Sequence, residues 1–410
     1  KTTWDERKTP EDATQKPMTN INGKRDGWCW EYIIRLANIL KKDIWINIHI
    51  SCDSNYVRKL AQKLKNELDP SINIYVENSN EVWAPDWNRH GPYNQAQAEH
   101  YGIGFKENYA RRTVELSNLF AEVFGKEAIN DRIRVILAGQ HAFSGRHDYH
   151  LDYISENIGP PKDYIYALST ALYFGSTKPD GTPEEINEGM IEEIEAQIND
   201  PKHNTYRMDH IDKAEEYDLP GGCTSYEGGP GIPSGGELDN LDNQIMAHRT
   251  KKMKDVMKKN YADGWFDIGG GLALQFTLAS GYNRYGCWGL TDDHTNPDRN
   301  YKMQAMRELI GEWQDPSAVE PPAVKEKFPR NYPNPFSSFT KIHFEIVDSG
   351  KVTIEVFDYL GNNVVTLLNR NMHAGEYYTV FDASGLAEGV YFYKITSAGS
   401  VKFGKCMLLK

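Results

Sequence analysis

The sequence has little cysteine, no long apolar run and no excess of positive charge. Its five cysteines show no CxxC spacing, so they indicate neither a zinc ribbon nor a dense disulfide framework. No apolar run approaches the roughly 20 residues that span a bilayer. The net charge of −12 argues against a nucleic acid or an anionic membrane as the partner, because both need a basic surface. A neutral substrate fits this composition better.

Motifs for a cofactor or a metal are lacking as well. The glycine-rich residues 268–271 lack the preceding strand and the phosphate ligands of a nucleotide-binding loop. His141, His147, Asp148 and His150 form a cluster, but the HDYH spacing is too short for a helical pair of metal ligands. We therefore expect these histidines to lie in a solvated loop, and we expect no cofactor and no bound metal.

What the sequence does have is length and an alternating pattern of short and long segments. Its 410 residues favour two domains, since single domains cluster around roughly 100 to 200 residues. Over residues 28–291, short β-branched runs alternate with longer amphipathic stretches, which indicates a parallel α/β fold. Six strands are expected, at residues 43–50, 72–81, 132–140, 164–174, 223–227 and 285–290. They would form an open doubly wound sheet or six units of an eight-stranded barrel.

A break in composition follows residue 313. Residues 314–327 hold three prolines and five charged residues and no aromatic residue, which is typical of a stiff, solvated linker. Beyond it the hydrophobic period changes from helical to two, with glycine turns between short strands. The expected domains are therefore an α/β domain over 1–313, a linker over 314–327 and an all-β immunoglobulin-like sandwich over 328–410.

The C-terminal domain carries three features that are specific in combination. They are the run YPNPF at 332–336, the residues GVY at 389–391 and a lysine-flanked end at 405–410. With them, residues 328–410 resemble the C-terminal sorting domain of the type IX secretion system. The resemblance implies export across an outer membrane, with the secretion machinery as a partner and a secreted or cell-surface location. The alternative, an ordinary immunoglobulin-like appendage of a carbohydrate-active enzyme, is also extracellular.

Two glutamates stand at the ends of expected strands, where the active sites of parallel α/β folds lie. Glu81 ends the run YVENSNE, and Glu227 lies in the run SYEGG. Hydrolysis of a glycosidic bond needs one carboxyl group to protonate the departing oxygen and another to attack the sugar or to activate water. Retaining enzymes hold the two groups about 5 Å apart. A closed barrel would bring these glutamates face to face more readily than an open sheet.

Asn80-Glu81 in SNEVW and Glu227 in YEGG resemble the motifs of clan A of the retaining glycoside hydrolases. That resemblance implies a (β/α)₈ TIM-type barrel, with an Asn-Glu acid/base at the end of strand 4 and a glutamate nucleophile on strand 7. If Glu81 ends strand 4, the six expected strands are strands 3 to 8 and Glu227 falls on strand 7. Strands 1 and 2 have no counterpart, so an N-terminally truncated barrel is expected over residues 1–313.

The resemblance also assigns roles to side chains. Glu227 would attack the anomeric carbon, Glu81 would act as the acid/base, and Asn80 would bind the 2-hydroxyl group. The other expected substrate-binding residues are Tyr173 beside the nucleophile, Trp288 as a floor for the sugar ring, and Trp83, Trp87 and His49 along the cleft. Each has a structural alternative, such as a salt-bridged glutamate, a core aromatic residue or a structural histidine.

The favoured function is therefore a secreted retaining glycoside hydrolase, an endo-acting β-glycanase that binds a polysaccharide or an oligosaccharide. One alternative is a non-catalytic carbohydrate-binding or scaffold protein on a degenerate barrel. Another is metal-dependent hydrolysis through the histidine cluster. Glucan, xylan and mannan differ at hydroxyl groups that loops recognise, so the sequence leaves the glycan open.

Overall fold

The computed structural model describes residues 3–12, 15, 27–82, 90–199, 206–234, 239–311, 329–397 and 400–410. The chain divides into two compact units, Lys1–Gln314 and Asp315–Lys410. Trp83 and Trp87 lie outside the described residues, and so does most of the expected linker.

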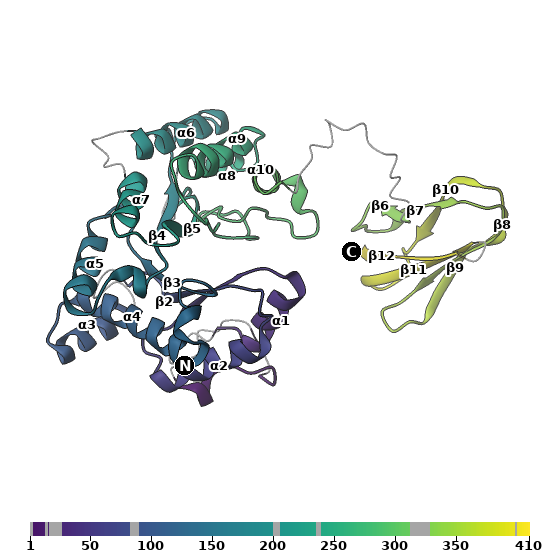
Figure 1. The fold of residues 1–410 in the computed structure, drawn as a ribbon. Coiled ribbons are helices and arrows are strands. Elements are labelled where there is room, and N and C mark those ends of the chain that lie inside the picture. The colour runs from purple at the N-terminus through teal and green to yellow at the C-terminus, as the bar shows by residue number, and fades with distance from the viewer. Residues whose placement is uncertain are drawn as a thin grey trace. The chain divides into compact units, whose positions relative to one another are not determined.

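The first unit is built on one sheet of five parallel strands (Figure 1). The strands are β1 (Ile44–Ile48), β2 (Ile74–Asn78), β3 (Ile133–Ala138), β4 (Ala167–Phe174) and β5 (Cys223–Pro230), and they pair in chain order. The parallel α/β fold expected from the sequence is thus confirmed. Within the described residues the sheet curls as half a barrel, and a closed eight-stranded barrel is not present.

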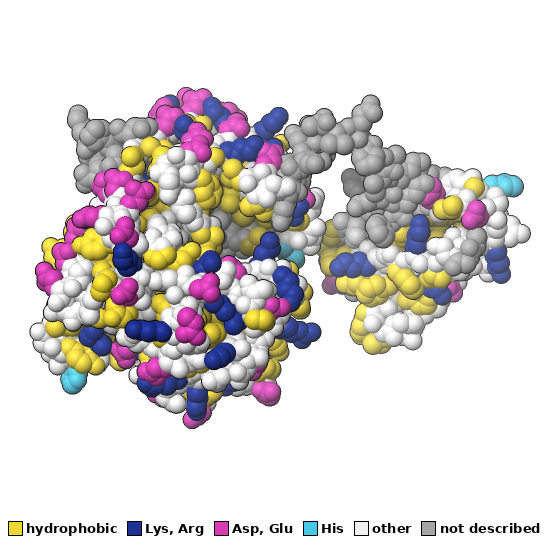
Figure 2. Space-filling view, in the orientation of Figure 1, with side chains coloured by type: hydrophobic (Ala, Val, Ile, Leu, Met, Phe, Trp, Pro, Cys, Tyr) yellow, Lys and Arg dark blue, Asp and Glu magenta, His cyan; other side chains and the backbone are white. Residues whose placement is uncertain are grey.

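Helices surround the outer face of this sheet (Figure 1). In α2 (Ser54–Glu67), the apolar residues Val57, Leu60, Ala61 and Leu64 recur at helical spacing and are all buried. The N-cap Asp53 accepts a hydrogen bond from the backbone of Tyr56 at 2.6 Å. The other helices are α1 (Trp30–Leu40), α3 (His90–Tyr101), α4 (Phe105–Phe124), α5 (Arg146–Asn157), α6 (Pro183–Asn199), α7 (Tyr206–Glu216), α8 (Leu241–Ala247), α9 (Lys252–Lys258) and α10 (Tyr301–Leu309). A π-helix, Lys259–Phe266, continues α9. Acidic side chains gather over α6 at the top of Figure 2.

The prediction of a sixth strand at residues 285–290 is wrong. Only isolated bridges occur there, because Gly286 (φ 154°) forms a tight turn with Asn283. The place beside β5 is taken by residues 271–276. Ser225 N donates to Leu272 O (2.8 Å), Leu274 N to Ser225 O (3.0 Å) and Phe276 N to Gly228 O (3.0 Å). The glycine run has a structural use here, since a Cβ on Gly271 would lie 3.0 Å from the carbonyl oxygen of Cys223.

The inner face of the sheet carries aromatic rings packed against alanines. Trp45 and Tyr75 stack at 5.5 Å between ring centroids and 6° between planes. Trp45 also packs with Tyr173 and Tyr226 against Ala138 and Ala171. Because alanine leaves room for a large ring opposite it, these aromatics fill the concave side of the half-barrel and form a floor beneath the carboxyl ends of the strands.

The prediction that the clustered histidines lie in a solvated loop is wrong. His147 and His150 lie on α5 and are buried, and His147 contacts the ring of His210 on α7 at 5.1 Å. The reason is helical spacing, because His147, His150, Leu151 and Ile154 form one inward-facing stripe. No group of three or more His, Cys, Asp or Glu side chains within the described residues is arranged to hold a metal ion.

The second unit consists of two antiparallel sheets, ordered β10-β7-β6 and β12-β11-β8-β9. Its strands are β6 (Arg330–Tyr332), β7 (Phe339–Ile346), β8 (Gly350–Phe357), β9 (Asn363–Met372), β10 (Gly375–Asp382), β11 (Gly389–Ser397) and β12 (Ser400–Leu408). The YPNPF run pairs with the last strand, since Phe336 N donates to Met407 O (2.9 Å) and Leu409 N donates to Phe336 O (2.8 Å). Two of the sequence features noted above therefore meet in one structural element.

Candidate functional site

Glu81 follows β2 in a turn with unusual backbone geometry. Ser79 and Glu81 have φ angles of 63° and 49°, a left-handed conformation that side-chain-bearing residues rarely adopt. Asn47 on β1 fixes this turn by donating from Nδ2 to the carbonyl oxygen of Ser79 at 2.7 Å. The Nδ1 atom of His90 lies 2.9 Å from Ser79 Oγ and 3.0 Å from the carbonyl oxygen of Asn80. Contacts from β1 and α3 thus hold the backbone that carries Glu81.

Glu227 is placed by an irregularity in β5. The register between β4 and β5 shifts after Thr170, so that Glu227 rather than Tyr226 pairs with Ala171. Ser225 Oγ donates to the backbone carbonyl of Glu227 at 2.8 Å. The hydroxyl group of Tyr173, near the end of β4, donates a hydrogen bond to the Glu227 carboxylate.

Glu81 and Glu227 lie close enough for their charges to interact. Burial and the negative charge of Glu81 raise the pKa of Glu227 to about 7, although the hydrogen bond from Tyr173 acts in the opposite direction. Two carboxyl groups that interact in this way titrate as a pair. One acid and one carboxylate are the two forms that a double displacement at a sugar requires.

A third carboxyl group, which the sequence analysis missed, lies beside this pair. Glu77 on β2 is 2% exposed, and its Oε2 atom accepts hydrogen bonds from Trp45 Nε1 and Asn47 Nδ2, both at 2.8 Å. Burial raises the pKa of Glu77 to about 8 and outweighs the hydrogen bonds from Trp45 and Asn47, which lower it; the charges of Glu227 and Glu81 act in the same direction as burial. The available signal was a glutamate that directly follows the apolar residues Ile74, Tyr75 and Val76 within a buried strand.

Trp288 contributes an aromatic surface, but from a loop rather than from a strand end. It is half-buried, and its ring meets that of Phe276 edge-on at 5.8 Å. Phe276 ends the segment beside β5 and is 41% exposed. The sequence analysis missed Phe276, because it follows the glycine run that was set aside.

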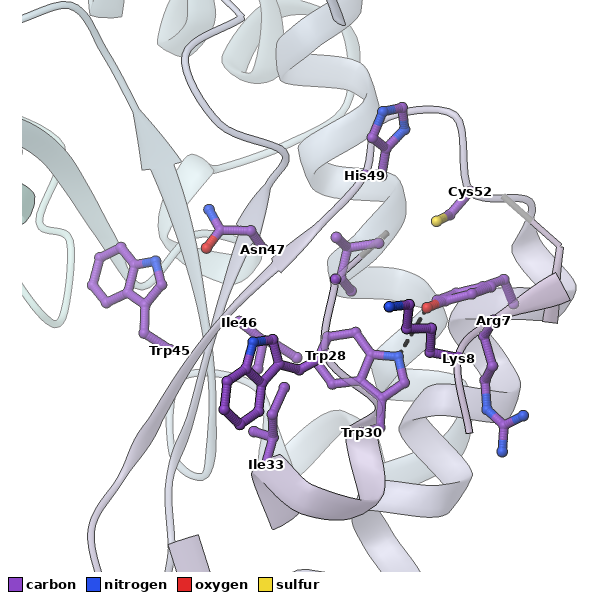
Figure 3. Close-up of a pocket in the computed structure, with 13 residues that line it drawn as sticks. Arg7, Lys8, Trp28, Trp30, Ile33, Trp45, Ile46, Asn47, His49 and Cys52 are labelled. Atoms are coloured by element: carbon purple, nitrogen blue, oxygen red, sulfur yellow. Dashed lines mark hydrogen bonds between the residues drawn. The ribbon is translucent and has the colours of Figure 1, made fainter. Parts of the chain in front are cut away.

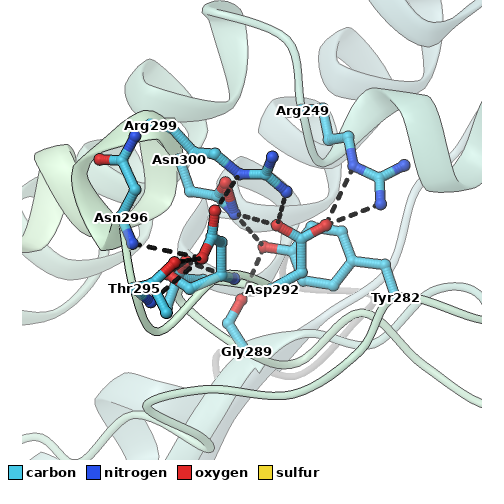
Figure 4. A network of polar contacts seen from close by, with 10 residues as sticks. Arg249, Tyr282, Gly289, Asp292, Thr295, Asn296, Arg299 and Asn300 are labelled. Atoms are coloured by element: carbon cyan, nitrogen blue, oxygen red, sulfur yellow. Dashed lines mark hydrogen bonds and ion pairs between the residues drawn. The ribbon is translucent and has the colours of Figure 1, made fainter. Parts of the chain in front are cut away.

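A charged network fixes the loop beyond Trp288 (Figure 4). Asp292 accepts hydrogen bonds from Arg249 (2.7 Å), Arg299 (2.8 Å) and Asn300 (2.9 Å). Burial acts to raise the pKa of Asp292, but the hydrogen bonds from Arg299 and Arg249 outweigh it and the pKa is lowered. The hydroxyl group of Tyr282 donates to Gly289 O at 2.8 Å, next to Trp288. The Trp288 loop is therefore anchored at both ends.

A cavity of about 350 Å³ lies beside β1 (Figure 3). Trp45 and Asn47 line it from one side of the strand, and Trp28 and Trp30 line it from the other. His49 stands at its rim, with its pKa lowered to about 4 by partial burial and by the nearby His90.

Asn80 is exposed beside Glu81. The structure thus brings Glu81, Glu227 and Tyr173 together, and His49 and Asn80 lie in the segments that follow β1 and β2.

Residues 330–408 match the family model for a secretion system C-terminal sorting domain. The C-terminal unit is a type IX sorting domain. The sorting domain indicates export to the cell surface or outside, as the sequence analysis expected. No helix within the described residues is long and apolar enough to cross a membrane. Comparison with curated proteins gives no match.

Solved structures that resemble the chain include glycoside hydrolases. A calcium-binding mutant of Bacteroides uniformis beta-glucuronidase 2 is 12% identical over 92% of this chain and 40% of that one, with a TM-score of 0.38. The GH51 arabinofuranosidase from Xanthomonas axonopodis pv. citri is 10% identical over 96% and 83%, with a TM-score of 0.46. This chain spans well under half the length of the glucuronidase. Both likenesses are distant.

Proposed function

We propose that the protein is an exported retaining glycoside hydrolase that cleaves β-linked glycans at internal linkages of the glycan. The observation that carries the proposal is the electrostatic interaction between the Glu81 and Glu227 carboxyl groups, with the Tyr173 hydroxyl group hydrogen-bonded to Glu227. A nucleophile must be ionised to attack, and a hydrogen bond from a neutral hydroxyl group favours the ionised form. This supports Glu227 as the nucleophile and Glu81 as the acid/base.

The proposed reaction proceeds in two displacements. In the first, a carboxylate oxygen of Glu227 forms a bond to the anomeric carbon as the glycosidic C–O bond breaks, and Glu81 gives its proton to the departing oxygen. In the second, Glu81 takes a proton from water, whose oxygen attacks the anomeric carbon and releases Glu227 as a carboxylate. Each inversion reverses the other, so the product keeps the starting anomeric configuration.

Other side chains are proposed to bind the sugar. Asn80 would form a hydrogen bond with the 2-hydroxyl group of the sugar. The rings of Trp288 and Phe276 would offer an apolar surface to one face of the sugar ring. His49 would line the cleft at the end of β1. The subsite roles of Trp83 and Trp87 stay predictions from the sequence.

The direct test is a screen of the purified protein against glucans, xylans and mannans. We expect release of internal fragments from at least one β-linked polysaccharide, with no loss of activity in a chelator. Glu215→Ala removes an exposed carboxyl group on α7 and is the matched control for substitutions at the site. Binding to a polysaccharide without turnover would instead support a carbohydrate-binding or scaffold protein.

Removing the Tyr173 hydroxyl group is expected to shift the pH profile. In Tyr173→Phe the Glu227 carboxylate loses a donor, so its pKa rises further and the pair binds its second proton at a higher pH. The acid limb of kcat/KM should move upward, and kcat should fall by about tenfold. Tyr166→Phe, which removes a hydroxyl group from another ring on the inner face, should leave the profile in place. An unmoved acid limb in Tyr173→Phe would contradict the role of Tyr173.

A further inference from the structure

Glu77 is a buried carboxyl group for which the proposed reaction has no direct use. It pairs with Asn47 across the sheet, so both side chains emerge on the inner face, next to Trp45. Both hydrogen bonds to Glu77, from Trp45 and Asn47, reach Oε2. The Oε1 atom is also buried and accepts no hydrogen bond from the described residues. Oε2 therefore accepts two hydrogen bonds from the described residues, and Oε1 accepts none.

This asymmetry fits a neutral carboxylic acid better than a carboxylate. A carboxylate exposes charge on both oxygens, and a buried charged oxygen without a donor is strongly unfavourable. A carboxylic acid presents an acceptor at the carbonyl oxygen and carries its proton on the other, which matches Oε2 and Oε1 respectively.

The surroundings of Glu77 also oppose a negative charge. The ionisable groups that interact with it electrostatically are Glu227 and Tyr226 on β5, Glu81 after β2, and Tyr109 on α4. All four are neutral or negative. An ionised Glu77 would add a further negative charge beside the carboxyl groups of Glu81 and Glu227, which raise its pKa.

The partners of Glu77 connect it to the acid/base. Asn47 Nδ2 donates both to Glu77 Oε2 and to the backbone carbonyl of Ser79, in the turn that ends at Glu81. Trp45 donates to the same Oε2 and forms part of the aromatic floor. Losing the acceptor at residue 77 would free both side chains at once.

We propose that Glu77 is a positioning residue which, as a neutral carboxylic acid, ties Trp45 and Asn47 on β1 to the turn that carries Glu81. Its consequence for the rate rests on the proposed glycosidase function. Because Glu77 is uncharged, Glu81 and Glu227 titrate as a pair of two groups and not as a cluster of three.

Glu77→Gln and Glu77→Leu separate the charge of Glu77 from its hydrogen bonding. Glutamine keeps an acceptor for Trp45 and Asn47 and is always neutral, so the acid limb of kcat/KM should stay where it is in the natural protein. Leucine has the size but no acceptor, so its kcat should fall about tenfold below that of the glutamine variant at every pH. If an ionised Glu77 were present, Glu77→Gln would remove a negative charge and move the acid limb to lower pH, which would overturn the proposal.

Two further readouts need no substrate, so they test Glu77 separately from the proposed function. Infrared difference spectra of the natural protein minus Glu77→Gln should show a protonated carboxyl band at neutral pH. The melting temperatures of the natural protein and of Glu77→Gln should also diverge as the pH rises. Because the pKa of Glu77 is raised from 4.5 to about 8, the folded state loses stability as pH rises through this range.

Glu77→Gln lacks this loss, so its melting temperature should gain a few degrees over the natural protein between about pH 5 and about pH 8. A carboxylate band in place of the protonated band, or a melting difference that is constant with pH, would overturn the neutral form of Glu77. Should Glu77→Leu fail to fold, Glu77→Gln alone decides the question.

Discussion

Replacing Glu227 by alanine is expected to lower kcat on a β-linked polysaccharide by about 10⁴-fold or more. The proposed first step forms a bond from Glu227 to the anomeric carbon. Of the neighbouring carboxyl groups that the structure describes, Glu81 is needed as the acid and Glu77 is buried, so neither replaces Glu227. The loss should appear equally with activated aryl glycosides, because a better leaving group does not restore a missing nucleophile.

Azide supplies a small anionic nucleophile that fits the space left by the carboxylate. In Glu227→Ala, azide should attack the face that Glu227 occupied, so a β-glycoside should give the α-glycosyl azide. Initial rates and the anomer of the azide product are the measurements. Activity within tenfold of the natural protein would remove Glu227 from the mechanism, and Glu215→Ala shows the effect of losing an unrelated carboxyl group.

Replacing Glu81 by alanine is expected to have the second largest effect, with kcat/KM on a polysaccharide lowered by about 10² to 10⁴-fold. The departing sugar oxygen is a poor leaving group without a proton from Glu81. An aryl glycoside whose phenol leaves readily needs little protonation, so its first step should be far less affected. Its glycosyl-enzyme should then accumulate, because water also lacks its base.

Azide should rescue this variant through the second step, and therefore with the opposite stereochemistry. In Glu81→Ala it should attack the glycosyl-enzyme from the β face and give the β-glycosyl azide. The two variants thus yield opposite anomers from one substrate. The reverse assignment of anomers would exchange the roles of Glu81 and Glu227, and an equal loss on both classes of substrate would contradict the acid role of Glu81.

Much of the fold could be predicted because local sequence determines it. The apolar β-branched runs that became β1 to β5 are short, and the stripe of Val57, Leu60 and Leu64 has helical spacing. Glu81 and Glu227 could be singled out because they end such runs in a parallel fold, where strand ends converge.

The parts that sequence reasoning missed depend on contacts between distant segments. Residues 271–276 pair with β5 although they are flanked by glycines, because Gly271 permits close approach to Cys223. The expected strand at 285–290 fails because a turn at Gly286 interrupts it. The position of Glu227 opposite Ala171 depends on the register shift in β5, which only the pairing with β4 reveals. The buried stripe of His147 and His150, by contrast, has helical spacing and could have been predicted from the local pattern.

The measurement that tests the central claim most directly is covalent labelling of the intact protein with activated 2-deoxy-2-fluoro β-glycosides. The fluorine slows both displacements and the good leaving group restores the first, so the glycosyl-enzyme accumulates. We expect stoichiometric labelling that peptide mass spectrometry places on Glu227 and that is absent in Glu227→Ala. A label on Glu81 or on another residue, or turnover of a polysaccharide without any covalent intermediate, would contradict the account.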